Sequence, residues 1–253
     1  MFQLRLFLIA VQFYTRVPIP AWVGFDPSWL TRSTRYFPLV GILVGAACTL
    51  VMMLASAALG ERIGVLIALA FGILLTGAFH EDGFTDTCDG LGGGQTPAQA
   101  LAIMKDSRIG AYGTIGIVLL LLIKWEALIR IDPLALVAAH GFSRGCAVLV
   151  MQTLPYLRAD AESKAKPVAI GLLPRDAMVA YLFAVLAVAP MLFAPTERTD
   201  LRAVAIALAA AVVVTLWFRR RLARRLGGYT GDTLGATQQL AEVAFYLGLA
   251  ATT

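Results

Sequence analysis

The stretch FPLVGILVGAACTLVMMLASAAL, residues 37–59, sets the fold class of this chain. None of its side chains is charged, and about 20 apolar residues in a helix span the roughly 30 Å hydrocarbon core of a bilayer. Backbone N–H and C=O groups find no water in lipid, so a spanning segment of this kind must be helical. The stretch therefore predicts a transmembrane helix.

Six further apolar stretches predict a polytopic bundle. Of the 253 residues, 59% are hydrophobic and 15% are charged, whereas soluble domains are about 45–50% apolar. The connections are short and show no linker, which predicts a single domain over 1–253. We expect an all-α bundle of about seven transmembrane spans with helices in the cytoplasmic loops. The further spans are expected at about 63–79, 113–130, 134–152, 177–195, 202–218 and 236–251.

The N-terminal segment is apolar but too short to cross a bilayer. Arg5 interrupts it, and Tyr14, Thr15 and Arg16 follow without the small-residue pattern of a cleavage site. We therefore expect it to be retained as an interfacial amphipathic helix. The three cysteines lie far apart and predict neither a disulfide framework nor a zinc site.

The positive residues predict the orientation of the bundle. With a cytoplasmic N-terminus, 15 of the 21 Lys and Arg residues lie inside, four lie outside, and Lys124 and Arg144 fall within spans. Such an excess on the cytoplasmic side is typical of membrane proteins. The run Arg219–Arg221 with Arg224 and Arg225 is interpreted as an orientation signal that contacts anionic lipid, and no nucleic acid is needed to explain the net charge of +5.

An acidic segment follows the second predicted span. It reads HEDGFTDTCDGLGGG over residues 80–94. On a helix, Asp82, Asp86 and Asp89 would lie within roughly 60° of one another and form one stripe. Like charges so placed repel, and oxygen ligands suit a hard cation such as Mg²⁺, Mn²⁺ or Ca²⁺. The stripe predicts a metal site at the cytoplasmic face, against the alternative of a solvated acidic helix end.

Two glycine-rich stretches lie on the same predicted side. Gly90–Gly94 holds four glycines in five positions, and glycine lets a backbone adopt positive φ and approach a phosphate. The second, Gly227–Gly235, carries Asp232 into the last span. Both are interpreted as candidate phosphate-binding loops.

The segment Met104–Gly110 adds a fourth carboxylate, Asp106, flanked by Lys105 and Arg108. The two cations are candidates for holding phosphate oxygens, with Asp106 as a ligand or base. The alternative is a surface ion-pair cluster.

Several polar residues fall inside predicted spans, where such groups usually face the bundle interior. His140 and Arg144 share a helix face, and Arg144 is expected to point at an acid or a substrate phosphate. Gln238 and Glu242 are expected to complete the inner rim. Lys124 lies toward the outer end of its span and is expected to snorkel to the surface.

Six blocks of this sequence resemble the adenosylcobinamide-GDP ribazoletransferases, or cobalamin synthases, of bacterial membranes. They run in order along nearly the whole chain, and the acidic block shows no departure from the family pattern. The blocks are Phe13–Pro20, Arg35–Gly41, His80–Gly94, Met104–Gly113, Ser143-Arg144 and Gly228–Gly235.

The resemblance implies a Mg²⁺-dependent phosphotransferase of the bacterial inner membrane with its active site facing the cytoplasm. Such enzymes join adenosylcobinamide-GDP to α-ribazole or its 5′-phosphate and release GMP. Asp82 is then the first choice for an indispensable metal ligand, with another carboxylate as base. The lipid bilayer is a further partner, and self-association stays open. The candidate catalytic and metal-binding residues are Asp82, Asp86, Asp89 and Asp106, and the candidate substrate- and phosphate-binding residues are Arg16, His80, Gly92, Gly93, Lys105, Arg108, Arg144 and Asp232.

Two alternatives compete with this interpretation. Asp86 to Gly90 satisfies the opening D-x-x-D-G of the CDP-alcohol phosphatidyltransferases, but the following Ala-Arg and the later paired aspartates are missing. A transporter is indicated by intramembrane His140 and Arg144, whereas carriers bind substrate at the midplane and these carboxylates lie at the rim.

Overall fold

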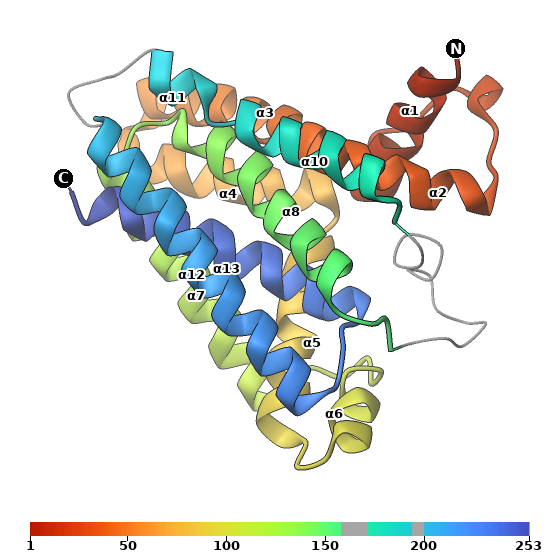
Figure 1. Ribbon diagram of the computed structural model, residues 1–253. Coiled ribbons are helices and arrows are strands. Elements are labelled where there is room, and N and C mark those ends of the chain that lie inside the picture. The colour runs from red at the N-terminus through yellow and green to blue at the C-terminus, as the bar shows by residue number, and fades with distance from the viewer. Residues whose placement is uncertain (158–171, 194–199, 253) are drawn as a thin grey trace.

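The computed structural model describes residues 1–157, 172–193 and 200–252, and these are helical almost throughout (Figure 1). The described ranges contain no β-strand, only one isolated bridge between Tyr156 and Tyr229. The all-α prediction is confirmed. The α-helices are α1 (Phe2–Tyr14), α2 (Pro27–Ser33), α3 (Phe37–Leu59), α4 (Glu61–Thr76), α5 (Phe79–Gly93), α6 (Pro97–Ile103), α7 (Ala111–Arg130), α8 (Ala135–Thr153), α10 (Pro174–Leu186), α11 (Ala189–Phe193), α12 (Leu201–Arg225) and α13 (Gly231–Ala250).

By length and composition, five helical segments of the described chain qualify as membrane spans, and a sixth does if the bent pair α4–α5 counts as one. The chain is thus a multi-pass membrane protein with fewer qualifying spans than the seven predicted. The two differences concern the second and the last predicted spans. α4 ends at Thr76, before the predicted end at 79, and α13 carries polar side chains into the bundle interior.

The break between α4 and α5 turns the chain by 90°. Gly77 (φ 66°) and Ala78 (φ 58°) both adopt the left-handed conformation, which ends one helix and redirects the next. The backbone N–H of Arg16 donates to the carbonyl of Leu75 at 2.8 Å and ties the segment after α1 to this corner. The acidic segment therefore leaves α4 at a steep angle, as α5 does in Figure 1, and packs against α13 and α7.

Glycines set a close helix contact between α3 and α8. A Cβ built on Gly41 would lie 2.3 Å from the carbonyl oxygen of His140, and one on Gly45 would lie 2.5 Å from that of Leu136. Without a hydrophobic driving force in lipid, small residues that let backbones approach provide the packing energy. The glycine pair brings α8, with His140 and Arg144, against α3.

α13 is the most enclosed long helix, and it packs on α12, α5, α8 and α7. Its buried side chains include Gln238, Gln239 and Glu242. Because these polar groups face other helices and not lipid, their hydrogen-bonding partners must come from those helices.

The N-terminal helix α1 confirms the predicted helical segment, and it packs on α2 and α3. Four of the basic residues that predict the orientation lie outside the described residues: Arg158, Lys164, Lys166 and Arg198.

Candidate active site

The predicted acidic stripe lies on α5. Asp82 is exposed in the first turn, Asp86 is half-buried one turn later, and Asp89 is buried. The helix confirms the spacing argument, but the three carboxylates have different surroundings. In the described part of the chain, the Asp82 carboxylate makes no hydrogen bond or ion pair.

The Asp89 carboxylate accepts hydrogen bonds from the N-terminus of α7. Its two carboxylate oxygens accept the backbone N–H groups of Gly110 at 2.7 Å and Gly113 at 2.8 Å. A larger residue at either position would displace the carboxylate, because a Cβ there would lie 2.4 Å from one of its oxygens. An anion at a helix N-terminus satisfies free N–H groups and the helix dipole. Asp89 therefore fixes α7 to α5.

Asp106 and Arg108 form an exposed ion pair next to α6. The guanidinium donates to both carboxylate oxygens at 2.6–3.2 Å, and the backbone N–H of Arg108 also donates to Asp106. These hydrogen bonds lower the pKa of Asp106 to about 2. The arrangement matches the surface ion-pair alternative. Lys105, also exposed, lies in the same segment.

The first glycine-rich stretch does not form the expected loop. Gly90, Gly92 and Gly93 lie within α5, and none of them adopts positive φ. Their missing side chains admit neighbours instead: Gly90 lies against Met104 and Gly92 against the ring of Tyr112. The loop prediction is wrong because glycine in this helix serves close packing. Phosphate binding by Gly92 and Gly93 stays a prediction.

Two other predicted residues do lie near the start of α5. Gly83 packs against the backbone of Asp232, at the N-terminus of α13, where a Cβ would lie 2.8 Å from the Asp232 carbonyl oxygen. The Arg16 guanidinium lies against Gly77 at the α4–α5 corner. Asp82, Asp232 and Arg16 therefore belong to one region around the first turn of α5.

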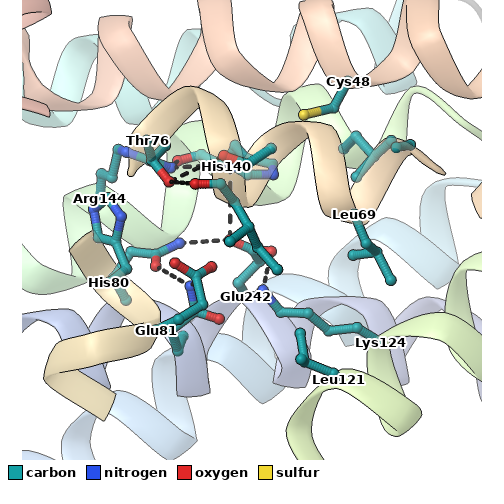
Figure 2. Close-up of a pocket in the computed structure, with 16 residues that line it drawn as sticks. Cys48, Leu69, Thr76, His80, Glu81, Leu121, Lys124, His140, Arg144 and Glu242 are labelled. Atoms are coloured by element: carbon teal, nitrogen blue, oxygen red, sulfur yellow. Dashed lines mark hydrogen bonds and ion pairs between the residues drawn. The ribbon is translucent and has the colours of Figure 1, made fainter. Parts of the chain in front are cut away.

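A second polar cluster lies inside the bundle beside this corner (Figure 2). The Lys124 ammonium of α7 donates to Glu242 of α13 at 2.7 Å, and both side chains are at most 4% exposed. The Tyr246 hydroxyl donates to the same carboxylate at 3.2 Å and the Gln238 amide at 2.5 Å. The prediction that Lys124 snorkels is wrong, because an acid within reach stabilises it inside.

The cluster reaches α5 through Gln239. Its amide donates to Glu81 at 2.9 Å, while the neighbouring Gln238 donates to Ser143 of α8 at 2.9 Å. Glu81 immediately precedes Asp82. Hydrogen bonds from α13 thus hold the first turn of α5 on its buried side while Asp82 faces outward.

Arg144 and His80 lie in this interior cluster, away from the exposed carboxylates. The Arg144 guanidinium donates to the carbonyl of His140 at 2.7 Å and lies over the ring of Phe37, on which His80 also stacks. Within the described ranges, four buried atoms of this cluster lack a hydrogen-bond partner: Glu81 Oε2, His80 Nε2, Arg144 Nε and Gln239 Oε1.

The space between these residues is about 20 Å³. A water molecule needs roughly 10–15 Å³, whereas small-molecule sites occupy about 300 Å³ or more. The space inside the cluster therefore has room for about one water molecule, and in the described conformation it cannot hold a substrate phosphate. The roles predicted for Arg144 and His80 in phosphate binding stay predictions.

No three carboxylate, histidine or cysteine side chains gather as a metal site within the residues that the structure describes. Mg²⁺ in phosphate-handling enzymes is commonly held by only one or two carboxylates together with substrate phosphates and water. Exposed Asp82 and its helix neighbour Asp86 fit such a donor set. Backbone N–H groups engage Asp89, and Arg108 engages Asp106.

Sequence reasoning missed Glu81, Gln239 and the partner of Lys124. The available signal was a lone lysine in an apolar stretch together with Gln238 and Glu242 one turn apart in another. Opposite charges buried in separate spans usually pair, so the sequence indicated that Lys124 needs an acidic partner but not which acid provides it.

Comparison with known proteins establishes the family. A model described as cobalamin-5-phosphate synthase matches residues 6–250. The chain belongs to the cobalamin-5-phosphate synthase family. A relative from Leptothrix cholodnii named adenosylcobinamide-GDP ribazoletransferase is 44% identical over 97% of this chain and 95% of its own length. A relative of the same name from Shewanella frigidimarina is 43% identical over 97% and 94%.

No solved structure matches this member of the cobalamin-5-phosphate synthase family. The family match confirms the resemblance of the sequence blocks. It leaves the phosphatidyltransferase and transporter alternatives without support, because it covers both the acidic helix and the intramembrane cluster.

Proposed function

We propose that this chain is an adenosylcobinamide-GDP ribazoletransferase, an enzyme that completes the nucleotide loop of cobalamin. The match along nearly the whole chain to relatives of that name carries the proposal. A hydroxyl of α-ribazole, or of its 5′-phosphate, attacks the phosphorus attached to cobinamide. A new P–O bond forms, the bond to GMP breaks, and GMP leaves.

Asp82 and Asp86 are the proposed ligands of Mg²⁺. The exposure of Asp82 in the first turn of α5, with Asp86 one turn further along, supports this, since the diphosphate of the substrate must approach from solvent. When bound, the cation supplies charge neutralisation for the diphosphate and its leaving group. A carboxylate of the same stripe would take the proton of the attacking hydroxyl.

Positive residues near the start of α5 and beside α6 are proposed to bind substrate phosphates. Arg16 lies at the α4–α5 corner, and Lys105 is exposed in the segment after α6. Arg108 would have to exchange Asp106 for a phosphate. Fixed cations placed where negative charge develops lower the barrier to phosphotransfer.

The proposed location is the bacterial inner membrane with the acidic site facing the cytoplasm. Bacterial relatives and the qualifying spans support the membrane, and the arginines at the end of α12 support the orientation. Arg225 from that end donates to the Gly94 carbonyl at 2.7 Å, so the arginine end of α12 and the end of α5 lie together.

The proposal is tested with purified protein in liposomes given adenosylcobinamide-GDP, α-ribazole 5′-phosphate and Mg²⁺, by following GMP release. We expect Asp82→Asn to lower the rate at least about 100-fold, which corresponds to losing a principal electrostatic contact in the transition state. Glu126→Gln is the matched control. It removes an exposed carboxylate on α7 that pairs with Arg130, and it should keep the wild-type rate.

Wild-type turnover by Asp82→Asn would remove Asp82 from the site. GMP release that continues in excess chelator would argue against the cation. No GMP release by the wild type under any of these conditions would overturn the proposed function itself.

A further inference from the structure

An apolar groove lies on the opposite face of α5 from the acidic stripe. Its volume is about 390 Å³, which falls in the range of small-molecule sites. At 100° per residue, Phe84, Cys88 and Leu91 point away from Asp82 and Asp86. The groove is therefore separate from the candidate active site. α5, α7, α12 and α13 form it, and its apolar lining includes Phe84, Leu91, Ile115, Trp217, Phe218 and Leu240.

The groove opens on the lipid-facing side of the bundle. Ile115 is 60% exposed and Trp217 is 55% exposed, although both lie on helices that qualify as membrane spans. Tryptophan is enriched where a membrane meets water, and Trp217 lies one turn before the arginine end of α12. The opening is therefore placed near the boundary between acyl chains and headgroups.

Arg221 is the one charged residue among those that line the groove in the described structure. It is exposed, and it makes no hydrogen bond or ion pair to any described residue. Two other arginines of the run already serve the fold: Arg219 donates to Thr153, and Arg225 donates to carbonyls at the end of α5. A guanidinium without a partner at the mouth of an apolar groove calls for an anion joined to a hydrocarbon chain.

We propose that this groove binds an anionic phospholipid, with one acyl chain in the groove and the phosphate on Arg221. The apolar lining takes the chain, because burying its methylenes away from water and against side chains is favourable. The guanidinium forms charge-assisted hydrogen bonds with the phosphate. Free phosphate would leave the apolar part of the groove unfilled. The lipid would thus lie against the back of the helix that carries Asp82.

The groove proposal depends on membrane insertion and not on the proposed reaction. Its test is native mass spectrometry of the full chain, purified in mild detergent and mixed with equal amounts of phosphatidylglycerol and phosphatidylcholine. The wild type should retain phosphatidylglycerol preferentially. Arg221→Gln should lower that preference about fivefold, since one Arg near an anionic surface contributes about 1 kcal/mol.

Arg220→Gln is the matched control, because Arg220 is an exposed neighbour in the same run that does not line the groove. It should keep the wild-type preference. Ile115→Trp, which fills the groove with a larger apolar side chain, should reduce retention of both lipids. Thermal unfolding of each variant in detergent confirms that it is folded.

Equal retention of the two lipids by the wild type would overturn the proposal. The proposal would also be overturned if Arg220→Gln and Arg221→Gln lowered the preference for phosphatidylglycerol equally, because the arginines would then attract anionic lipid only through their combined charge. Full retention of lipid by Ile115→Trp would place the lipid elsewhere, and a dimer that excludes lipid would assign the groove to a second copy of the chain.

Discussion

Asp82 and Asp89 lie on one stripe of α5, but their surroundings differ. Asp82 is exposed and suited to a cation or substrate. Asp89 is buried, and backbone N–H groups at the start of α7 occupy its two oxygens. The same residue type at helical spacing is therefore open to ligands at one end of the stripe and committed to architecture at the other.

The difference predicts that the same substitution lowers stability at Asp89 and leaves it nearly unchanged at Asp82. Asp89→Asn replaces one accepting oxygen by an amide that faces an N–H donor, and unsatisfied buried groups cost about 1–3 kcal/mol. We expect a clearly lower midpoint of thermal unfolding in detergent for Asp89→Asn, and a midpoint near that of the wild type for Asp82→Asn. Equal midpoints in the two variants would contradict the structural role of Asp89.

Among the helices, glycines and one buried ion pair hold the bundle together. Gly41 and Gly45 bring α3 against the backbone of α8, and Lys124 joins α7 to Glu242 of α13. The two contacts differ in kind, because the first depends on the shapes of the helices and the second on mutual neutralisation of two buried charges.

Gly45→Val tests the close packing of α3 on α8. A Cβ there would lie 2.5 Å from a backbone carbonyl of α8, so the two helices must separate. We expect a loss of stability of roughly 1–3 kcal/mol, the range of overpacked cores. Thermal unfolding in detergent measures this loss. Gly60→Val is not a suitable control, because Gly60 has a φ of 87° and valine at that φ would itself strain the backbone. Leu50→Val, at an exposed position of the same helix, should change the midpoint little.

Lys124→Met tests the ion pair. It leaves the Glu242 carboxylate buried without its cation, and breaking one side of a buried pair costs about 3–5 kcal/mol. The double variant Lys124→Met with Glu242→Gln should recover much of that loss, because both charges are gone. Arg130→Met breaks an exposed pair with Glu126 and should cost less than about 1 kcal/mol. Equal unfolding midpoints for the single and double variants would contradict the coupling.

For the molecule as a whole, the polar chemistry concentrates at the end of the bundle where α5, α6 and the arginines of α12 lie together (Figure 1). The other end carries the short α3–α4 and α7–α8 connections. A membrane enzyme arranged in this way has its active site at one surface, and charge decides which surface that is.

The proposed orientation predicts one-sided chemical labelling. Ser107→Cys lies in the exposed segment after α6, whereas Thr252→Cys lies beyond the other end of α13. A membrane-impermeant thiol reagent should label Ser107→Cys in inverted inner-membrane vesicles and Thr252→Cys in spheroplasts. The reverse pattern would invert the orientation. The unsubstituted chain, in which Cys48 and Cys146 are buried and Cys88 is half-buried, controls for labelling of the native thiols.

Local sequence patterns were enough to predict the fold class, most helices and the stripe of Asp82, Asp86 and Asp89. These features depend on periodicity and on the length of apolar runs, which a bilayer converts directly into helices. The family match confirmed the family that the ordered motifs resemble.

Tertiary packing was needed to reveal the 90° break at Gly77 and Ala78, the engagement of Asp89 by α7, and the pairing of Lys124 with Glu242. The two residues of that pair are 118 positions apart. Local patterns do not encode such a contact, because its free energy arises only when packing removes both groups from water and brings them together. For the same reason the sequence alone could not tell which aspartate faces solvent and which one anchors a helix.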